Sequence, residues 1–333
     1  MGLSNTSMSE SHNDEVRQMI DALPPGSSQY DAEGLGAEDL EELLQRDRLF
    51  THTEHYDSDG KRILDSYVVF KNVAPDTMRD FSNQRHLGRI KDQSLTNHLL
   101  IINMPSGDHE SAIRYFDKVL QRKLDEMRTD FSLEVKACGS KDVHGTTRTK
   151  IPDTSFRPRL LPASRSDEWP SLVLEVGYSE SASKLKKDAS WWLTESQGEV
   201  RVVITLKVFR NHRVHLEMWQ FRDGAARPRP VMTQEATVTK SASGYSASAP
   251  MVIRFQDLLL RPPAGNGECD IVLDRGDLEQ MMRRHWAFIH IREELDAGVA
   301  NSAVLLTAKH DFLVSRSSEV PSCSGKLRYA LAK

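Results

Sequence analysis

A glutamate stands inside an otherwise apolar run of strand-forming residues, and this run constrains the fold more than any other feature. The run is Ser171-Leu-Val-Leu-Glu-Val176. Short apolar segments of this kind are typical of buried strands. A carboxylate flanked by Leu174 and Val176 in such a strand is costly unless it is paired or binds a metal. We therefore expect Glu175 to belong to a site.

A second carboxylate, Asp153, precedes this strand. It follows Pro152, and 21 residues separate it from Glu175. Two carboxylates on neighbouring strands can converge on one hard cation, and Mg²⁺ favours one or two protein carboxylates together with water and phosphate oxygens. Such an ion polarises a phosphodiester and lowers the pKa of an attacking water. The pattern predicts a site for Mg²⁺ or Mn²⁺, and the alternative is that Asp153 is only a turn residue after proline.

A lysine is the usual third member of a site of this kind, where it holds the water or stabilises the developing charge. The position two residues after the strand glutamate is Gly177. The helix predicted from about residue 180 to 196 offers lysines, and Lys184, Lys187 and Trp191 share one stripe of it. We take Lys187 as the first candidate and Lys184 as the second. A solvated helix face is the alternative for each.

These motifs resemble the PD-(D/E)XK nuclease superfamily. Pro152-Asp153, Glu175-Val176 and a lysine-bearing helix follow one another as they do there. The run Trp169-Pro-Ser-Leu-Val-Leu-Glu-Val-Gly-Tyr-Ser-Glu-Ser181 is similar to uncharacterised fungal members, and the resemblance extends over residues 99–221. It implies an α/β, restriction-endonuclease-like core with a mixed central sheet flanked by helices. It also implies a Mg²⁺-assisted phosphodiester hydrolase.

The resemblance further implies roles for single residues. Asp153 and Glu175 match the two acidic positions, and Val176 would lend its backbone carbonyl to the metal. Glu110 matches an acidic position on the first helix of the core. This sequence departs from the superfamily at Gly177, where the motif has a lysine. Either a helix lysine has taken over that role, or the site is catalytically weak.

The chain is expected to divide into three parts. Residues 1–60 are rich in Ser, Asn, Asp, Glu and Gly, and one short amphipathic stretch, Ala37–Leu44, could form a helix. The rest has too little apolar surface to fold, so we expect residues 1–60 to be a largely unstructured tail. Residues 61–262 form the nuclease-like core, in which an amphipathic helix over residues 109–128 precedes the strands described above. Residues 263–333 form a C-terminal extension with one helix, near residues 277–295, and a tail that shows no periodicity.

Composition limits the partners and the compartment. The net charge is −4, so nucleic-acid contacts must come from a local patch, and residues 136–165 carry seven basic and two acidic side chains. Three widely spaced cysteines give neither a disulfide framework nor a zinc motif. No run of 18 apolar residues and no secretory signal are visible, so we expect no membrane span and an intracellular protein of the cytoplasm or nucleus.

Three functions remain open from the sequence. The first is a Mg²⁺-dependent nuclease that acts on DNA or RNA. The second is a catalytically degenerate module with the same fold that binds nucleic acid or a protein partner. The third is an unrelated α/β protein whose acids are structural, which would be favoured by Asp153 and Glu175 carboxylates more than about 8 Å apart.

Overall fold

The computed structural model describes most of the chain between residues 16 and 296. The described residues are 16–17, 19–24, 27–52, 66–83, 88–104, 107–128, 131–146, 148–178, 182–209, 211–222, 229–265 and 267–296. The chain divides into two compact units, residues 1–285 and residues 286–333. Both sheets discussed below belong to the first unit. Among the described helices, none combines the length and apolar character needed to cross a membrane.

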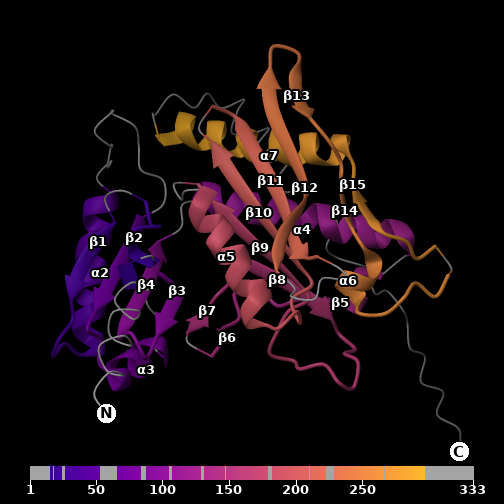
Figure 1. Cartoon of the computed structure of the whole chain (residues 1–333). Helices are drawn as coiled ribbons and strands as arrows, with labels where there is room; N and C mark the ends of the chain where they lie inside the picture. The colour runs from indigo at the N-terminus through magenta and orange to yellow at the C-terminus, as the bar shows by residue number, and fades with distance from the viewer. Residues whose placement is uncertain are drawn as a thin grey trace, which may run out of the picture. The chain divides into compact units, whose positions relative to one another are not determined.

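The first sheet combines four strands from the N-terminal part of the chain, drawn in indigo and purple in Figure 1, with two short strands from residues 143–150. Its strand order is β1-β2-β4-β3-β7-β6. The strands are β1 (Ser28–Asp31), β2 (Ser66–Lys71), β3 (Arg89–Ser94), β4 (Leu99–Met104), β6 (Val143–His144) and β7 (Thr149–Lys150). β1 pairs parallel with β2, and the other neighbours pair antiparallel. Two helices, α2 (Ala37–His52) and α3 (Pro75–Asn83), share a core cluster with this sheet.

Residues 28–52 differ from the largely unstructured tail predicted for residues 1–60, because they form β1 and α2. α2 includes the short stretch Ala37–Leu44 that could form a helix, but it extends to His52. Leu40 and Leu44 lie four residues apart on one side of α2 and are fully buried. β1 has a single aromatic residue, Tyr30, whose ring stacks on Phe70 of β2 with centroids 5.8 Å apart. The apolar surface that stabilises this segment therefore comes from later strands, which the tail's own composition does not reveal. Residues 1–15 and 53–60 lie outside the described residues.

The second sheet contains the predicted glutamate-bearing strand, β9, as an interior strand next to the central strand β10. Its strand order is β13-β12-β11-β10-β9-β8-β5. The strands are β5 (Val135–Ala137), which follows a 3-10 turn, β8 (Thr154–Pro158), β9 (Leu172–Gly177), β10 (Val202–Phe209), β11 (Arg213–Phe221), β12 (Pro230–Ser241) and β13 (Gly244–Ala247). β9 and β10 pair parallel, whereas the other neighbours pair antiparallel. Both sheets are therefore mixed.

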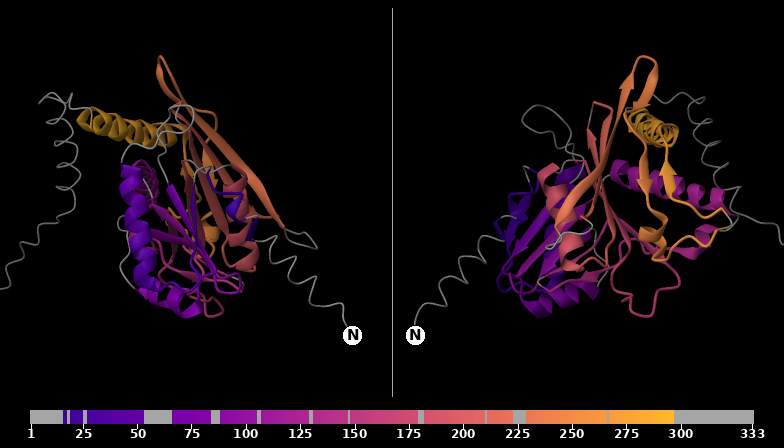
Figure 2. Two further views of the ribbon diagram at one scale, coloured as in Figure 1. Left: turned by 90° about the vertical axis from the view of Figure 1, so that its left-hand side faces the viewer. Right: turned by 45° about the vertical axis from the view of Figure 1, so that its right-hand side comes forward.

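Helices cover both faces of the second sheet. α5 (Ala182–Glu195) packs on the face that carries Val173 and Val203. α4 (Gly107–Met127) packs on the opposite face, where the ring centroids of Phe116 and Phe156 are 6.5 Å apart. The two helices lie on either side of the strands in the right-hand view of Figure 2. The predicted α/β core with a mixed sheet flanked by helices is confirmed.

The C-terminal boundary of the core differs from the one predicted at residue 263. β15 (Ile271–Leu273) pairs with β14 (Met251–Ile253), and α6 (Phe255–Leu259) lies between them in the chain. α7 (Arg275–Asp296) then carries the chain across the boundary between the two compact units. The pairing of β15 with β14 keeps residues beyond 263 in the core. The predicted C-terminal tail after residue 296 lies outside the described residues.

A buried histidine makes stability depend on pH. His285 of α7 is fully buried, and its Nδ1 lies 2.8 Å from the hydroxyl of Ser111 in α4. Burial lowers the pKa of His285 to about 3, with a smaller contribution from the charge of His212. In the unfolded chain a histidine has a pKa near 6.5. The unfolded chain therefore takes up a proton that the folded protein does not, and stability is lost as pH falls below about 6.5.

We expect this histidine to account for about 2 kcal/mol of the unfolding free energy lost between pH 7 and pH 5. Replacing it, as in His285→Gln, should flatten the pH dependence by that amount, even if the variant is less stable at pH 7. Urea unfolding at both pH values measures the difference. The exposed His144→Gln variant is the control. If both variants lost the same unfolding free energy between pH 7 and pH 5, the prediction would be contradicted.

Candidate functional site

Asp153 and Glu175 meet because β8 and β9 pair antiparallel. Thr154 is opposite Leu174 in this ladder, so the next position along each strand sets Asp153 opposite Glu175. The Nζ of Lys91 lies between them, 2.7 Å from Asp153 Oδ1 and 2.6 Å from Glu175 Oε2. The two oxygens are thus much closer together than the separation of about 8 Å that would exclude a shared ion.

Each carboxylate is also held by its second oxygen. The backbone N–H of Val176 donates to Asp153 Oδ2 at 2.7 Å, and the indole N–H of Trp192 donates to Glu175 Oε1 at 2.6 Å. His109 Nε2 lies 3.4 Å from Asp153 Oδ1. These contacts aim one oxygen of each acid at the same point. All three side chains that meet there are buried, with exposed fractions of 4% for Lys91 and Asp153 and 0% for Glu175.

The lysine reaches this point from a β-bulge in the other sheet. In the β3–β4 ladder Ile90 is opposite Ile102 and Asp92 is opposite Ile101, so Lys91 is an extra residue without its own partner in the register. A bulge re-aims a side chain that regular alternation would direct elsewhere, and bulges are common beside active sites. The bulge allows Lys91 and its neighbour Asp92 both to be buried.

A second group of buried charges lies beside the first. Asp188 of α5 accepts hydrogen bonds from Lys184, at 2.7 Å, and from Lys150 of β7. Asp92 accepts one from Arg148 at 2.9 Å. Four cationic and four anionic side chains therefore balance in the combined cluster: Lys91, Arg148, Lys150 and Lys184 with Asp92, Asp153, Glu175 and Asp188.

The two acids that share Lys91 differ in proton affinity. Burial raises the pKa of Asp153, but Lys91 and His109 outweigh burial and hold that pKa well below its usual value. Burial also raises the pKa of Glu175, to about 6; the charge of Lys91 opposes this effect, and Asp153 adds to it. Glu175 is therefore the acid of the pair that takes up a proton first as pH falls.

The predicted lysine stripe of α5 faces a cavity of about 370 Å³ beside this cluster. Lys184, Lys187 and Trp191 all line the cavity, together with Lys91 and Arg148. Lys184 is buried, and its Nζ lies over the ring of Tyr67, 5.7 Å from the centroid. Lys187, the first candidate from the sequence, is exposed. Of these lysines, the one in contact with both carboxylates is Lys91, which sequence reasoning did not select.

The other predicted metal ligands are placed differently. Glu110, in the first turn of α4, pairs with Arg89 at 2.9 Å, and its side chain is one-third exposed. Val176 offers the pair its backbone N–H, whereas the resemblance implied its carbonyl. Among the described residues, no group of three or more histidine, cysteine, aspartate or glutamate side chains is arranged to hold a metal ion. The structure thus brings together Asp153 and Glu175 but not the larger ligand set.

Two further residues of the site were misread from the sequence. Trp192 was not assigned to the site; it is buried, and its indole N–H donates to Glu175. Lys150 was counted in a basic patch, although it is fully buried against Asp188. A signal was present for Trp192, because it lies on the buried side of a helix next to an apolar strand that carries an acid. We see none for Lys150.

Comparison with known proteins gives little independent information. No protein-family model matches the chain, and no curated protein matches it. Among solved structures, the chain is similar to a protein from Anabaena variabilis described as a putative nuclease belonging to DUF820. The match covers 47% of this chain and 84% of that chain, with 12% identity and a TM-score of 0.31. A likeness at this level carries no argument about function, which has to be drawn from the site itself.

Proposed function

We propose that the chain is a Mg²⁺-dependent nuclease that hydrolyses phosphodiester bonds of DNA or RNA at the Asp153–Glu175 pair. The observation that supports this most directly is that Asp153 Oδ1 and Glu175 Oε2 both face one cation position, now held by the ammonium of Lys91. Two carboxylate oxygens directed at one point are a donor set that suits a hard divalent ion.

The residues around the pair have definable tasks. Val176 N–H and Trp192 hold the two acids in orientation, so little rearrangement is needed to bind a cation. When bound, Mg²⁺ would polarise the phosphodiester and lower the pKa of the attacking water. Lys91, once released from the carboxylates, can donate to phosphate oxygens and stabilise the negative charge that develops on them. It would thus fill the role of the motif lysine, whose position in this chain is occupied by Gly177.

The cavity beside the pair is lined by four basic and three acidic side chains, the acids being Asp92, Asp188 and Glu195, so a small excess of positive charge faces a substrate. Arg148, Lys184 and Lys187 line it with Lys91, and the aromatic ring of Trp191 is part of the same wall. Basic side chains contact phosphates, and aromatic rings stack on unpaired bases. In this proposal the exposed Lys187 positions the phosphate backbone, whereas the buried Lys184 stays paired with Asp188 and contributes only its charge. Neither lysine contacts the reacting atoms.

A cleavage assay with the full chain tests the proposal. Plasmid, circular single-stranded DNA and RNA are incubated with Mg²⁺, with Mn²⁺ or with a chelator. Cleavage is expected only with the divalent ions and should fall to background in Asp153→Asn and in Glu175→Gln. Glu42→Gln, which removes an exposed acid of α2, should retain activity. Cleavage that persists in Asp153→Asn would mean that a contaminant is responsible.

A second candidate is a catalytically degenerate module that binds nucleic acid or a protein partner. The specific observation in its favour is that Lys91 already neutralises the acid pair within a cluster of equal positive and negative charge. In that case Mg²⁺ should leave the melting temperature of the protein unchanged beyond a general salt effect, which NaCl at the same ionic strength measures. A Mg²⁺-specific rise would instead favour the nuclease.

A further inference from the structure

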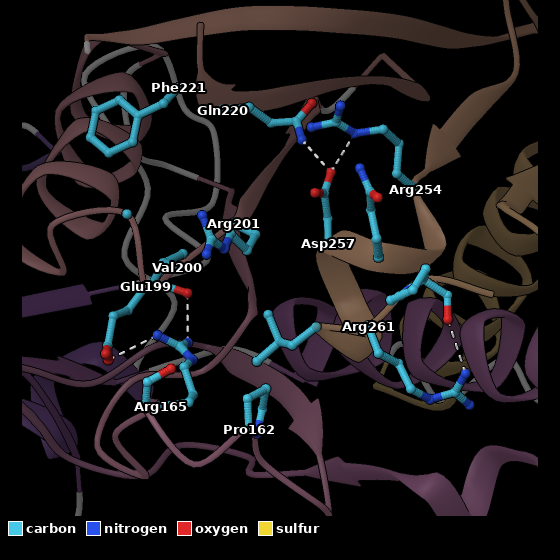
Figure 3. Close-up of a pocket in the computed structure, with 15 residues that line it drawn as sticks. Pro162, Arg165, Glu199, Val200, Arg201, Gln220, Phe221, Arg254, Asp257 and Arg261 are labelled. Atoms are coloured by element: carbon cyan, nitrogen blue, oxygen red, sulfur yellow. Dashed lines mark hydrogen bonds and ion pairs between the residues drawn. The ribbon is translucent and has the colours of Figure 1, made fainter. Parts of the chain in front are cut away.

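A second cavity lies at the end of β9 and β10 opposite the acid pair, and Figure 3 shows its lining. The backbone N–H of Arg201, just before β10, donates to the carbonyl of Ser171, just before β9. Glu175 lies four residues further along the strand, a distance of about 13 Å. The cavity has a volume of about 510 Å³, which is within the range of small-molecule sites.

Arginines dominate the charged lining of this cavity. It contains four arginines and two acids: Arg165, Arg201, Arg254 and Arg261 with Glu199 and Asp257. Three of the arginines have acid partners, which are Glu199 for Arg165 at 2.8 Å, Asp257 for Arg254 at 2.7 Å and Glu268 for Arg261 at 2.7 Å. Within the described part of the chain, Arg201 pairs with no acid. Its charge is the one that the cavity leaves uncompensated.

Arg165, which also lines the cavity, is held in place by several hydrogen bonds. Its Nη2 donates to the carbonyls of Trp169, Pro170 and Glu199, at 3.1, 3.2 and 2.5 Å, and its side chain is 7% exposed. Burial lowers the pKa of Arg165, Glu199 opposes this effect, and the positive charge of Arg201 lowers the pKa further. Arg165 thus keeps its own partners and adds a buried positive charge to the wall of the cavity that Arg201 also lines, which favours an anion at Arg201.

An aromatic ring completes the cavity. Phe221, at the end of β11, lines it alongside Arg201 and Gln220 (Figure 3). An apolar ring beside an uncompensated guanidinium suits a ligand that joins a planar base to a phosphate. The ring can stack on the base, while arginine binds phosphate oxygens through charge-assisted and often bidentate hydrogen bonds.

We propose that this cavity binds a nucleotide, with its phosphate at Arg201, beside the buried charge of Arg165, and its base against Phe221. A free mononucleotide and the phosphorylated end of a nucleic-acid strand share this chemistry. The site contains neither Asp153 nor Glu175, so it does not depend on the metal site proposed above.

Calorimetric titration of the full chain in the presence of a chelator tests the site without any contribution from divalent ions. The probes are adenosine 5′-monophosphate, adenosine, inorganic phosphate and a 5′-phosphorylated dinucleotide. The monophosphate should bind at least roughly 10-fold more weakly to Arg201→Gln than to wild type, since a hydrogen-bonded charge contact is lost. The matched control is Arg114→Gln, which removes an exposed arginine of α4 that also has no acid partner among the described residues. It should bind like wild type.

The remaining titrations test the base contact and the phosphate contact separately. Phe221→Leu should weaken the monophosphate but not inorganic phosphate, and adenosine alone should bind weakly. Tighter binding of the dinucleotide than of the monophosphate would identify a strand end as the ligand. Equal affinities of Arg201→Gln and Arg114→Gln for the monophosphate would overturn the proposal, and so would the absence of binding to wild type. Equal affinity of wild type for phosphate and the monophosphate would overturn the role of Phe221.

Discussion

Replacing Lys91 by methionine is expected to destabilise the protein by about 3 to 5 kcal/mol, because it leaves two buried carboxylates without a counter-charge. Asp153 and Glu175 are opposite each other in the β8–β9 ladder, and both are almost completely buried. Lys91 is the cation between them. Methionine keeps most of the side-chain volume, so the loss measures the charge and not a cavity. Urea unfolding gives the free energy, and the exposed Lys118→Met of α4 should change it by less than about 0.5 kcal/mol.

The same variant separates the nuclease from the degenerate module. If the acid pair is a metal site, Mg²⁺ should stabilise Lys91→Met more than wild type, because the ion no longer competes with the ammonium. A ligand at 100 times its Kd adds about 2.7 kcal/mol to the unfolding free energy. The nuclease further requires that Lys91→Met binds Mg²⁺ but no longer cleaves nucleic acid. A variant that is destabilised yet indifferent to Mg²⁺ would leave the pair a structural ion cluster.

The parts of this site that the sequence predicted are those whose signal is local. Glu175 could be found because its apolar neighbours Leu174 and Val176 mark a buried strand, in which an acid needs a partner. The stripe of Lys184, Lys187 and Trp191 could be found because helical spacing alone sets it, and all three line one cavity. In both cases the residues that carry the information lie within two turns of one helix or within one strand.

Lys91 could not be found in this way. β3 reads Arg-Ile-Lys-Asp-Gln-Ser, which has neither an apolar run nor a clear alternation, so no strand was predicted there. The side chain is aimed by a bulge, and its partners Asp153 and Glu175 are 62 and 84 residues away in the chain. β1 was missed for a similar reason, since it depends on its pairing with β2 across a long stretch of sequence. Burial that is created by distant strands leaves no periodic signal in the segment itself.

Asp188→Asn is expected to destabilise the protein by a similar 3 to 5 kcal/mol or so, since it removes the acid between two buried ammonium groups. Lys150 and Lys184 both donate to this carboxylate, and their side chains are 0% and 8% exposed. Burial raises the pKa of Asp188, but the two lysines outweigh burial and hold the pKa below its usual value, so the acid is charged at neutral pH. An amide offers one oxygen and no charge, and the melting temperature should fall by roughly 6 to 20 °C. Asp80→Asn, on the exposed surface of α3, is the matched control.

A second substitution shows whether the loss of stability in Asp188→Asn comes from the buried lysine charges that it leaves without an acid. Lys150→Met alone should also be destabilising, because it unbalances the cluster in the opposite direction. The double variant Asp188→Asn with Lys150→Met loses one charge of each sign and restores the balance with Lys184 left beside the amide. It should therefore be more stable than the two single losses predict by addition, with a coupling of about 1 to 3 kcal/mol. Strictly additive losses would mean that Asp188 and Lys150 contribute through separate contacts. The balanced cluster beside the acid pair would then not act as one electrostatic unit.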